Sequence, residues 1–152
     1  MRKSSTPSKE TEVSYRRGGG GEDFSRIREC AELLLKAGAQ LEPLDRDFWT
    51  PLYLTVFDDN YPVAELLIQA GSNVNHRDRS DSTMLHSASA SNSLHVAELF
   101  LKNGADVNAF DSHGLTPLNY AVKGQEMVDL IRRYGGKYAE EIWEEWRRKS
   151  ER

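Results

Sequence analysis

The sequence predicts an all-α solenoid, a stack of similar helical layers, and three observations lead to this prediction. Landmark residues return at an interval of 33 (83 − 50 and 116 − 83), in the sets Thr50, Thr83, Thr116, then Leu52, Leu85, Leu118, then Gly38, Gly71, Gly104. The apolar residues between these landmarks follow the spacing of one helix face. A glycine stands just after each apolar run, where a helix is expected to end.

The landmarks also carry a motif. The chain reads Thr-Pro-Leu at Thr50 and at Thr116, and Thr-Met-Leu-His at Thr83. With this period, the chain resembles the ankyrin repeat family from about residue 24 to residue 136. The resemblance implies a β-turn and two antiparallel helices per repeat, and a scaffold that recognises other proteins.

Bulk composition describes a soluble globular protein with a modest core. Of the 152 residues, 38% are hydrophobic and 29% are charged, and the net charge is −4. This charge is too small to predict a nucleic-acid-binding surface. A single cysteine, Cys30, excludes an internal disulfide and fits a reducing compartment. The sequence shows neither a signal peptide nor a membrane-spanning run, so we expect a cytoplasmic or nuclear location.

Three parts are predicted: a flexible basic tail over residues 1–22, a repeat domain over residues 23–136 and a C-terminal helix over residues 137–152. The tail is poor in apolar residues and ends in a run of four glycines, so burial cannot offset its ordering entropy. Up to Gly21 it holds five basic and two acidic side chains, a net charge of +3 (5 − 2). A solvated tail or an expression leader explains this composition, and binding to phosphate or an acidic partner is the alternative.

The repeat domain is predicted to begin with a half-repeat over residues 23–44. Phe24, Ile27, Ala31, Leu34 and Leu35 follow helical spacing. This segment aligns with the second helix of a repeat, and the first helix would fall on the glycine run. We expect the half-repeat to cap the array, although an incomplete end also leaves apolar surface for a second chain.

Three repeats follow, over residues 45–77, 78–110 and 111–136. In the first, Thr50 is placed to cap a helix that starts with Pro51. The second helices are predicted to bury two apolar stripes: Val63, Leu66, Leu67, Ala70 and Val96, Leu99, Phe100, Leu101. His86 matches the motif histidine of the family and is expected to tie its helix to the neighbouring turn, a structural role.

The turn glycine that the family places two residues before the motif threonine is present only in the third repeat, as Gly114. Phe48 and Asp81 occupy the same position in the other two. A bulky residue is disfavoured where φ must be positive, so a distorted turn is predicted at Phe48. The third repeat is two residues shorter (135 − 104 is 31), and its polar Arg132 replaces an apolar residue. It is therefore expected to be the C-terminal capping repeat.

The last segment is predicted to be an amphipathic helix. Tyr138, Ile142 and Trp146 are spaced four apart, and Trp143 lies beside them. Glu144 with Arg148 and Glu145 with Lys149 form i,i+4 pairs. The aromatic residues either seal the last repeat or, with Trp143 and Trp146 as anchors, contact another protein.

No arrangement of residues predicts catalysis, a cofactor or a metal. The four histidines lack the cysteine companions and spacing of a metal site, and the glycine run lacks the strand and Gly-Lys-Ser/Thr of a phosphate loop. An enzyme is not expected.

The resemblance places recognition on the turn tips and on the first helices of the repeats. The positions predicted to bind protein are Arg46, Asp47, Trp49, Tyr53, Phe57, Asp58, Arg79, Ser80, Ser82, His113, Leu115 and Lys123. The first repeat stands apart because its aromatic residues cluster beside charged ones, the composition of a binding hot spot with a polar rim. Alternatively, some of these rings fold back to cover the half-repeat.

The sequence therefore favours a non-enzymatic adaptor or inhibitor that binds a partner protein through the concave face of the repeats. The alternative is a structural oligomer, assembled through the truncated N-terminal face and the Trp-bearing C-terminal helix. Nucleic-acid association through the basic tail ranks last.

Overall fold

The computed structural model describes residues 21–42 and 48–152, and side chains from residue 28 onward within those ranges. The part of the chain described contains helices and no strands. The seven α-helices and one 3₁₀ helix are α2 (Gly21–Lys36), α3 (Pro51–Leu54), α4 (Tyr61–Gln69), α5 (Met84–Ser91), α6 (Leu94–Lys102), η1 (Pro117–Tyr120), α7 (Gln125–Arg133) and α8 (Ala139–Ser150). The all-α fold predicted from the period is confirmed. The predicted tail falls almost wholly outside the described residues.

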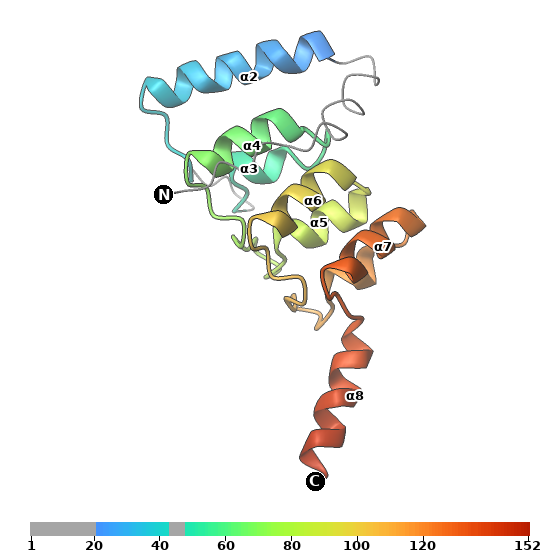
Figure 1. Ribbon diagram of the computed structural model, residues 1–152. Helices are drawn as coiled ribbons and strands as arrows, with labels where there is room; N and C mark the ends of the chain where they lie inside the picture. Colours follow the sequence, from blue (N-terminus) through green and yellow to red (C-terminus); the bar gives the residue numbers. More distant parts are fainter. Residues whose placement is uncertain (1–20, 43–47) are drawn as a thin grey trace, which may run out of the picture.

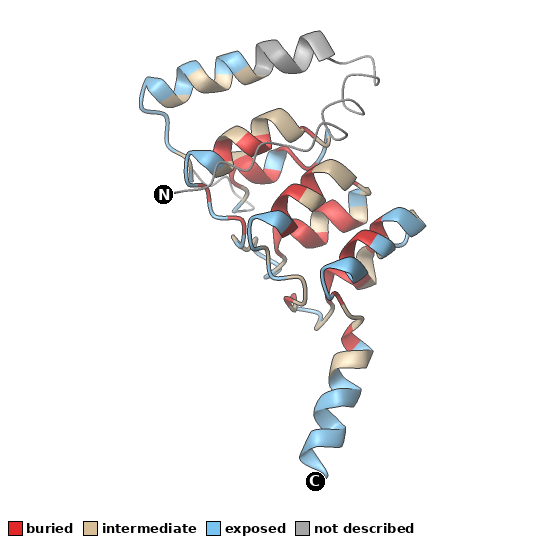
Figure 2. Ribbon diagram, viewed as in Figure 1, coloured by how far each residue is buried: buried red, intermediate tan, exposed pale blue. Residues whose placement is uncertain are grey.

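The helices stack in layers along the chain (Figure 1). The second helices contact one another in order, α2 against α4, α4 against α6 and α6 against α7. Among the first helices of the three repeats, α5 packs against η1, while α3 packs against α4 of its own repeat. Burial follows this stacking, since the buried residues concentrate from α3 to α7 and α8 is largely exposed (Figure 2).

The core is formed by the landmark leucines and by the second helices. Leu52, Leu85 and Leu118 are all buried, one in each repeat. The predicted stripe on α6 is confirmed, because all four of its apolar residues are buried. The stripe on α4 is partly wrong: Leu67 is buried and Val63 and Leu66 are half-buried, whereas Ala70 is the C-cap residue and is exposed.

The half-repeat is a single helix docked on one neighbour. Ala31 and Leu35 are half-buried, whereas Leu34 is exposed, so the prediction that Leu34 faces inward is wrong. The reason is that α2 packs against α4 only at the face that carries Arg28, Ala31 and Leu35, one turn apart from each other. Arg28 donates a hydrogen bond to the Glu65 carboxylate at 3.4 Å and ties the two helices together.

Glu65 is nearly buried on α4 and serves two partners. Tyr61 donates its hydroxyl to Oε1 of Glu65 at 3.2 Å, and Arg28 binds the other oxygen. Burial and the nearby Glu65 carboxylate raise the pKa of Tyr61 to about 12. The buried charge is thus paired and hydrogen-bonded, as burial of a carboxylate requires.

The first helices differ in length, and residue type explains the differences. The helix α5 spans eight residues, but α3 ends at Leu54 and continues as turns through Thr55, Val56 and Phe57, whose side chains disfavour a helix. The third repeat has only the 3₁₀ helix η1 in place of the first α-helix that the resemblance implied. The third repeat is two residues shorter than the others in this segment, so α7 begins two residues earlier than the interval would place it.

Polar ties run from each repeat to the next. Asn75 donates from its amide nitrogen to the Gly104 carbonyl at 3.0 Å and accepts from the Asp106 N–H at 2.8 Å. Asn108 repeats this arrangement with Gly135 and Lys137. Asp59, at the end of the first helix segment, accepts from the backbone N–H groups of His95 and Val96 and so caps α6 of the following repeat.

Phe48 has the same left-handed backbone conformation as the equivalent residues of the other two turns. The φ angles of Phe48, Asp81 and Gly114 are 64°, 58° and 71°. The prediction of a distorted turn is therefore wrong at this residue: Phe48 itself takes the left-handed conformation. Its side chain is exposed, with the guanidinium of Arg79 5.3 Å from the ring centre.

We predict that Phe48→Gly raises the free energy of unfolding by about 0.5–1 kcal/mol. Relief of the left-handed strain, about 1–2 kcal/mol, exceeds the entropy cost of a glycine, about 0.5–1 kcal/mol. Asp81→Gly is the matched control and should gain less, because Asp tolerates this conformation. Urea denaturation of both variants measures the difference, and an Asp81→Gly gain equal to that of Phe48→Gly would contradict the explanation.

Candidate functional site

The predicted binding residues spread over the turn tips and the first helices. Arg46 and Asp47 lie outside the described residues. Among the others, the exposed side chains are Phe57, Asp58, Arg79, Ser80, His113 and Lys123. Trp49, Ser82 and Leu115 are half-buried, and Tyr53 is buried. The structure brings these residues together in two groups, an aromatic one and a polar one.

The aromatic group, which we call the aromatic cluster, consists of Trp49, Tyr53 and Phe57. Trp49 stacks on Tyr53 with ring centres 4.9 Å apart and planes 13° from parallel. Phe57 tilts against both, at 5.3 Å from Trp49 and 5.9 Å from Tyr53. Such stacked and tilted pairs stabilise each other beyond the area that they bury. Phe57 is 53% exposed, so the cluster presents a rigid apolar edge at the surface.

Tyr53 supports this cluster from below and is not itself a surface residue. It is only 5% exposed, so little of its surface is open to the partner contact that the sequence predicted for it. The interval explains its burial, because Tyr53 stands 33 positions before His86, at the motif histidine position. Its hydroxyl shares a hydrogen bond of 2.5 Å with Ser87 of the next repeat.

The motif histidine position ties each repeat to the next segment of the chain. His86 accepts the Thr83 N–H at Nδ1 (3.0 Å) and donates from Nε2 to the Leu115 carbonyl of the next turn (3.2 Å), so its predicted structural role is confirmed. Asn119 accepts the Thr116 N–H at 3.1 Å and the Ala139 N–H at 3.0 Å. Three different side chains therefore perform the same connecting role.

The polar group surrounds a small cavity, which we call the serine notch. It has a volume of about 180 Å³ and lies between the second and third repeats, beside the turn tips. Its lining residues are Asp78, Ser80, Ser82, His86, Ser87, Ala90, His113 and Tyr120. Ser87 and Tyr120 are not among the binding positions that the resemblance implies. The interval could have found them, since positions 54, 87 and 120 are equivalent.

The electrostatics of the notch are set by Asp111, His86 and Tyr120. Burial works to raise the pKa of Asp111, but hydrogen bonds from the Tyr120 hydroxyl and from two backbone N–H groups hold it below its ordinary range. The bond to Asp111, with burial, raises the pKa of Tyr120 to about 12. Burial lowers the pKa of His86. At neutral pH the notch therefore combines a carboxylate, a neutral imidazole and a neutral phenol.

The described histidine and carboxylate side chains beside the notch do not form a group that could hold a metal ion. His113 lies 3.7 Å from the Asp111 carboxylate, but the backbone N–H groups and Tyr120 already satisfy that carboxylate. The described part of the chain contains no group of three or more His, Cys, Asp or Glu side chains that could hold a metal ion. None of the helices in that part is long and apolar enough to cross a membrane.

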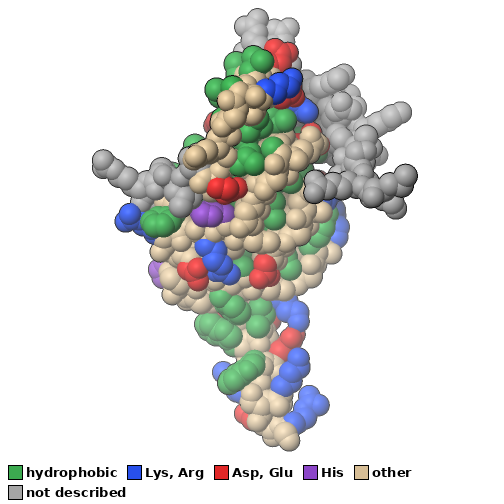
Figure 3. Space-filling view, turned by 90° about the vertical axis from the view of Figure 1, so that its left-hand side faces the viewer, with side chains coloured by type: hydrophobic (Ala, Val, Ile, Leu, Met, Phe, Trp, Pro, Cys, Tyr) green, Lys and Arg blue, Asp and Glu red, His purple; other side chains and the backbone are tan. Residues whose placement is uncertain are grey.

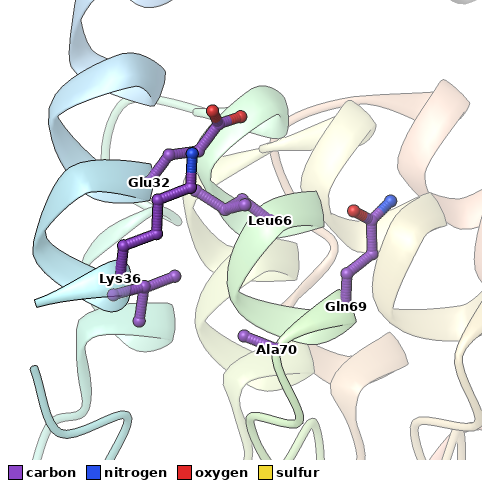
Figure 4. Close-up of a pocket in the computed structure, with 6 residues that line it drawn as sticks. Glu32, Lys36, Leu66, Gln69 and Ala70 are labelled. Carbon is purple, nitrogen blue, oxygen red and sulfur yellow. The ribbon is translucent and has the colours of Figure 1, made fainter. Parts of the chain in front are cut away.

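A second concave feature is a groove between α2 and α4. It is lined by Glu32, Leu35, Lys36, Leu66, Gln69 and Ala70. Figure 4 shows Glu32 and Lys36 extending from α2 toward Leu66 on α4, with Gln69 farther along the same helix. Leu33, beside the groove on α2, is 65% exposed, so this end of the array leaves apolar surface uncovered.

At the opposite end, α8 extends away from the repeats (Figure 1). Hydrophobic side chains lie along one flank of α8, and most of its Lys and Arg side chains lie along the other (Figure 3). Trp143 stacks on Phe110 with ring centres 6.2 Å apart, whereas Trp146 is 70% exposed. Trp143 therefore packs against the repeat domain, as the first alternative predicts. Trp146 remains exposed and available to another protein, as the second alternative requires.

The charges of α8 differ partly from the predicted pairs. Glu144 and Arg148 lie 3.4 Å apart as expected. Glu145 instead pairs with Lys137 at 2.6 Å, a residue that precedes the helix. Arg132 makes a forked contact with Glu141 at 2.8 and 3.1 Å and anchors the start of α8 to α7. A polar residue at position 132 thus connects the last repeat to the C-terminal helix.

Helix pairs that repeat and stack in order define a class of fold, the α-solenoids. Comparison with family models then gives the family. Residues 47–79 match a model of the ankyrin repeat, and residues 67–121 match a model of many ankyrin repeat copies. Residues 47–121 of the chain therefore contain ankyrin repeats. Ankyrin repeats generally serve as protein–protein interaction modules and are typically not enzymes. A search of curated proteins found no matching sequence.

We predict that acid destabilises the array through His86. Burial lowers its folded-state pKa below the ordinary value of about 6.5, so below that pH the unfolded chain binds a proton that the folded chain does not. Stability is then fully present above about pH 6.5 and is lost as the pH falls toward the folded pKa. His86→Asn is the control, because Asn119 shows that an amide oxygen can accept the N-cap N–H at this position.

Urea denaturation at a series of pH values tests this. His86→Asn should lower stability at pH 8, where the Leu115 bond is lost, and should flatten the pH dependence between pH 7 and 5.5. Equal pH slopes in the two proteins would contradict the role assigned to His86.

Proposed function

We propose that this protein is a non-catalytic adaptor or inhibitor that binds a segment of a partner protein across the aromatic cluster and the serine notch. The exposed edge of Phe57 on a stacked aromatic support carries the proposal. Aromatic residues held rigidly by neighbours are typical of interface hot spots, because they bury large area without losing much conformational freedom. The proposal also includes the division of the chain into a tail, a repeat domain and a C-terminal helix, with boundaries near residues 22 and 136.

The surroundings of the cluster supply the polar rim that such interfaces have. Asp58 is exposed directly after Phe57, and Arg79 is exposed on the next turn tip. Rim charges of both signs favour correct orientation of a partner over raw affinity. Lys123 and His113 extend the exposed polar surface along the third repeat.

We predict that Phe57→Ala weakens partner binding at least about tenfold, the usual effect of truncating a hot-spot aromatic. Affinity purification followed by mass spectrometry identifies the partner, and titration of the purified partner then measures Kd. Trp146→Ala is the matched control, an exposed aromatic on α8, and should leave Kd unchanged. The proposal fails if Trp49→Ala and Phe57→Ala both lower the melting temperature while neither changes Kd.

Self-assembly is a second candidate function, favoured by the exposed Trp146 at one end and the exposed Leu33 and Leu34 at the other. A contact between two different ends is heterologous, and it forms chains of molecules unless the rotation closes them into a ring. The exposed Leu33 flank and the groove beside it would receive α8 of a second copy.

Light scattering at tens of micromolar tests this candidate by complementation. Trp146→Ala and Leu33→Ser should each be monomeric alone, because each variant has lost one of its two contact surfaces. Mixed together they should form dimers and nothing larger, since each retains the end that the other lacks. A monomeric parent protein, or variants that assemble as well as the parent, would exclude this function.

A further inference from the structure

The serine notch exists because the middle repeat carries small residues where its neighbours carry large ones. Three sets of equivalent positions show this: Trp49, Ser82, Leu115, then Leu54, Ser87, Tyr120, then Phe57, Ala90, Lys123. In each set the middle member is a serine or an alanine. The small side chains of the second repeat therefore leave a recess, with Tyr120 and His113 of the third repeat on one side. At about 30 Å³ per water molecule, its 180 Å³ would hold about six waters, the space of one long side chain.

The chemistry of the notch is that of an acceptor site. Asp78 accepts the Ser80 and Ser82 N–H groups with Oδ1, at 2.8 and 3.0 Å, which fixes its carboxylate at the rim. The hydroxyls of the lining serines add further oxygens, and the Asp111 carboxylate lies directly behind Tyr120. The residues that line the notch include no lysine or arginine. Its charge is thus negative at neutral pH, and it complements a cation.

The two neighbouring arginines are engaged elsewhere. Arg77 donates to the carbonyls of Asp81 and Phe110, at 2.7 and 2.8 Å, and pairs with the Asp81 carboxylate at 3.2 Å. Arg79 lies over the ring of Phe48. A cationic group that neutralises the notch would therefore come from another molecule.

One tyrosine ring, Tyr120, lines the notch, and a second, Tyr53, lies behind the lining residue Ser87. Ser87 bonds to the Tyr53 hydroxyl, and the Tyr53 ring leads on to Trp49 and Phe57. Tyr120 is held in place by its 2.6 Å bond to Asp111. A flat guanidinium stacks on aromatic faces and presents five N–H donors in a fixed plane, whereas an ammonium is a compact and strongly hydrated charge. The flat ring of Tyr120 beside several oxygen acceptors fits the guanidinium.

We propose that the serine notch binds an arginine side chain of the partner protein, while an apolar residue of the same segment lies on Phe57. This rests on the proposed function and names the chemistry of the partner. Asp78 supplies the opposing charge, the serine hydroxyls accept further hydrogen bonds and Tyr120 supplies the stacking surface. The negative charge of the notch disfavours binding of a phosphate group there.

The first experiment uses the full chain, labelled with ¹⁵N, and N-acetyl-arginine amide as the probe. Saturable shifts are expected at the amides of Ser82, Ser87 and Ala90. N-acetyl-citrulline amide has nearly the same shape without the charge, and N-acetyl-lysine amide has the charge without the plane. Both should bind at least about fivefold more weakly. Equal binding of all three probes, or shifts spread over the whole surface, would overturn the proposal.

The variants isolate the notch. Ala90→Phe fills it with the residue that the first repeat holds at the equivalent position 57, and an unchanged melting temperature shows that the variant is folded. It should abolish the shifts. Asp78→Asn keeps an oxygen for the turn N–H groups and removes the charge, and it should weaken the probe about tenfold, as expected for one charge-assisted hydrogen bond. Ser91→Phe is the matched control, with the same ring on an exposed residue outside the lining, and should bind the probe normally.

The identified partner then separates this inference from the proposed function. Loss of binding in both Ala90→Phe and Phe57→Ala supports the two together. Loss in Phe57→Ala with unchanged binding in Ala90→Phe overturns the notch and leaves the proposed function standing. Unchanged binding in both variants overturns the proposed function and, with it, the role assigned to the notch.

Discussion

The structure depends on one constraint: a repeat of this kind cannot bury its apolar faces alone and must be held in register with the next. Contact between successive second helices supplies the burial, and the residue at the motif histidine position supplies part of the register. Tyr53, His86 and Asn119 each reach forward, by a hydroxyl, an imidazole or an amide. A scaffold with ties of this kind stays rigid while its surface residues vary, which is the property that recognition needs.

This constraint explains why the candidate site lies where it does. Because Tyr53 must reach the next repeat, its ring is buried and fixed, and Trp49 and Phe57 gain a firm support. Because its target is Ser87, the bond ends on the lining of the notch. One structural tie thus joins an apolar edge to a polar cavity. A partner that contacts both would meet a surface whose geometry is set before binding, which reduces the entropy lost on association.

The sequence predicted the frame well because the interval compares equivalent positions directly. Leu52, Leu85 and Leu118 recur at this interval, and all three are buried. The same interval could not show what each end packs against. Leu34 follows the helical pattern of an inward residue, yet α2 has one neighbouring helix where an inner residue needs two, so Leu34 is exposed. Phe48 was judged by intrinsic preference, whereas the surrounding repeats hold its backbone in the left-handed conformation.

The candidate site was predicted only in part, for a related reason. Composition revealed the aromatic residues, because large rings at surface positions are conspicuous in one repeat. It could not reveal the notch, because a cavity is made by the small size of Ser82, Ser87 and Ala90 relative to their equivalents on both sides. Small residues carry no signal alone and gain meaning only by comparison across repeats. In a solenoid, a binding pocket can therefore be sought wherever one repeat is smaller than both neighbours at several equivalent surface positions.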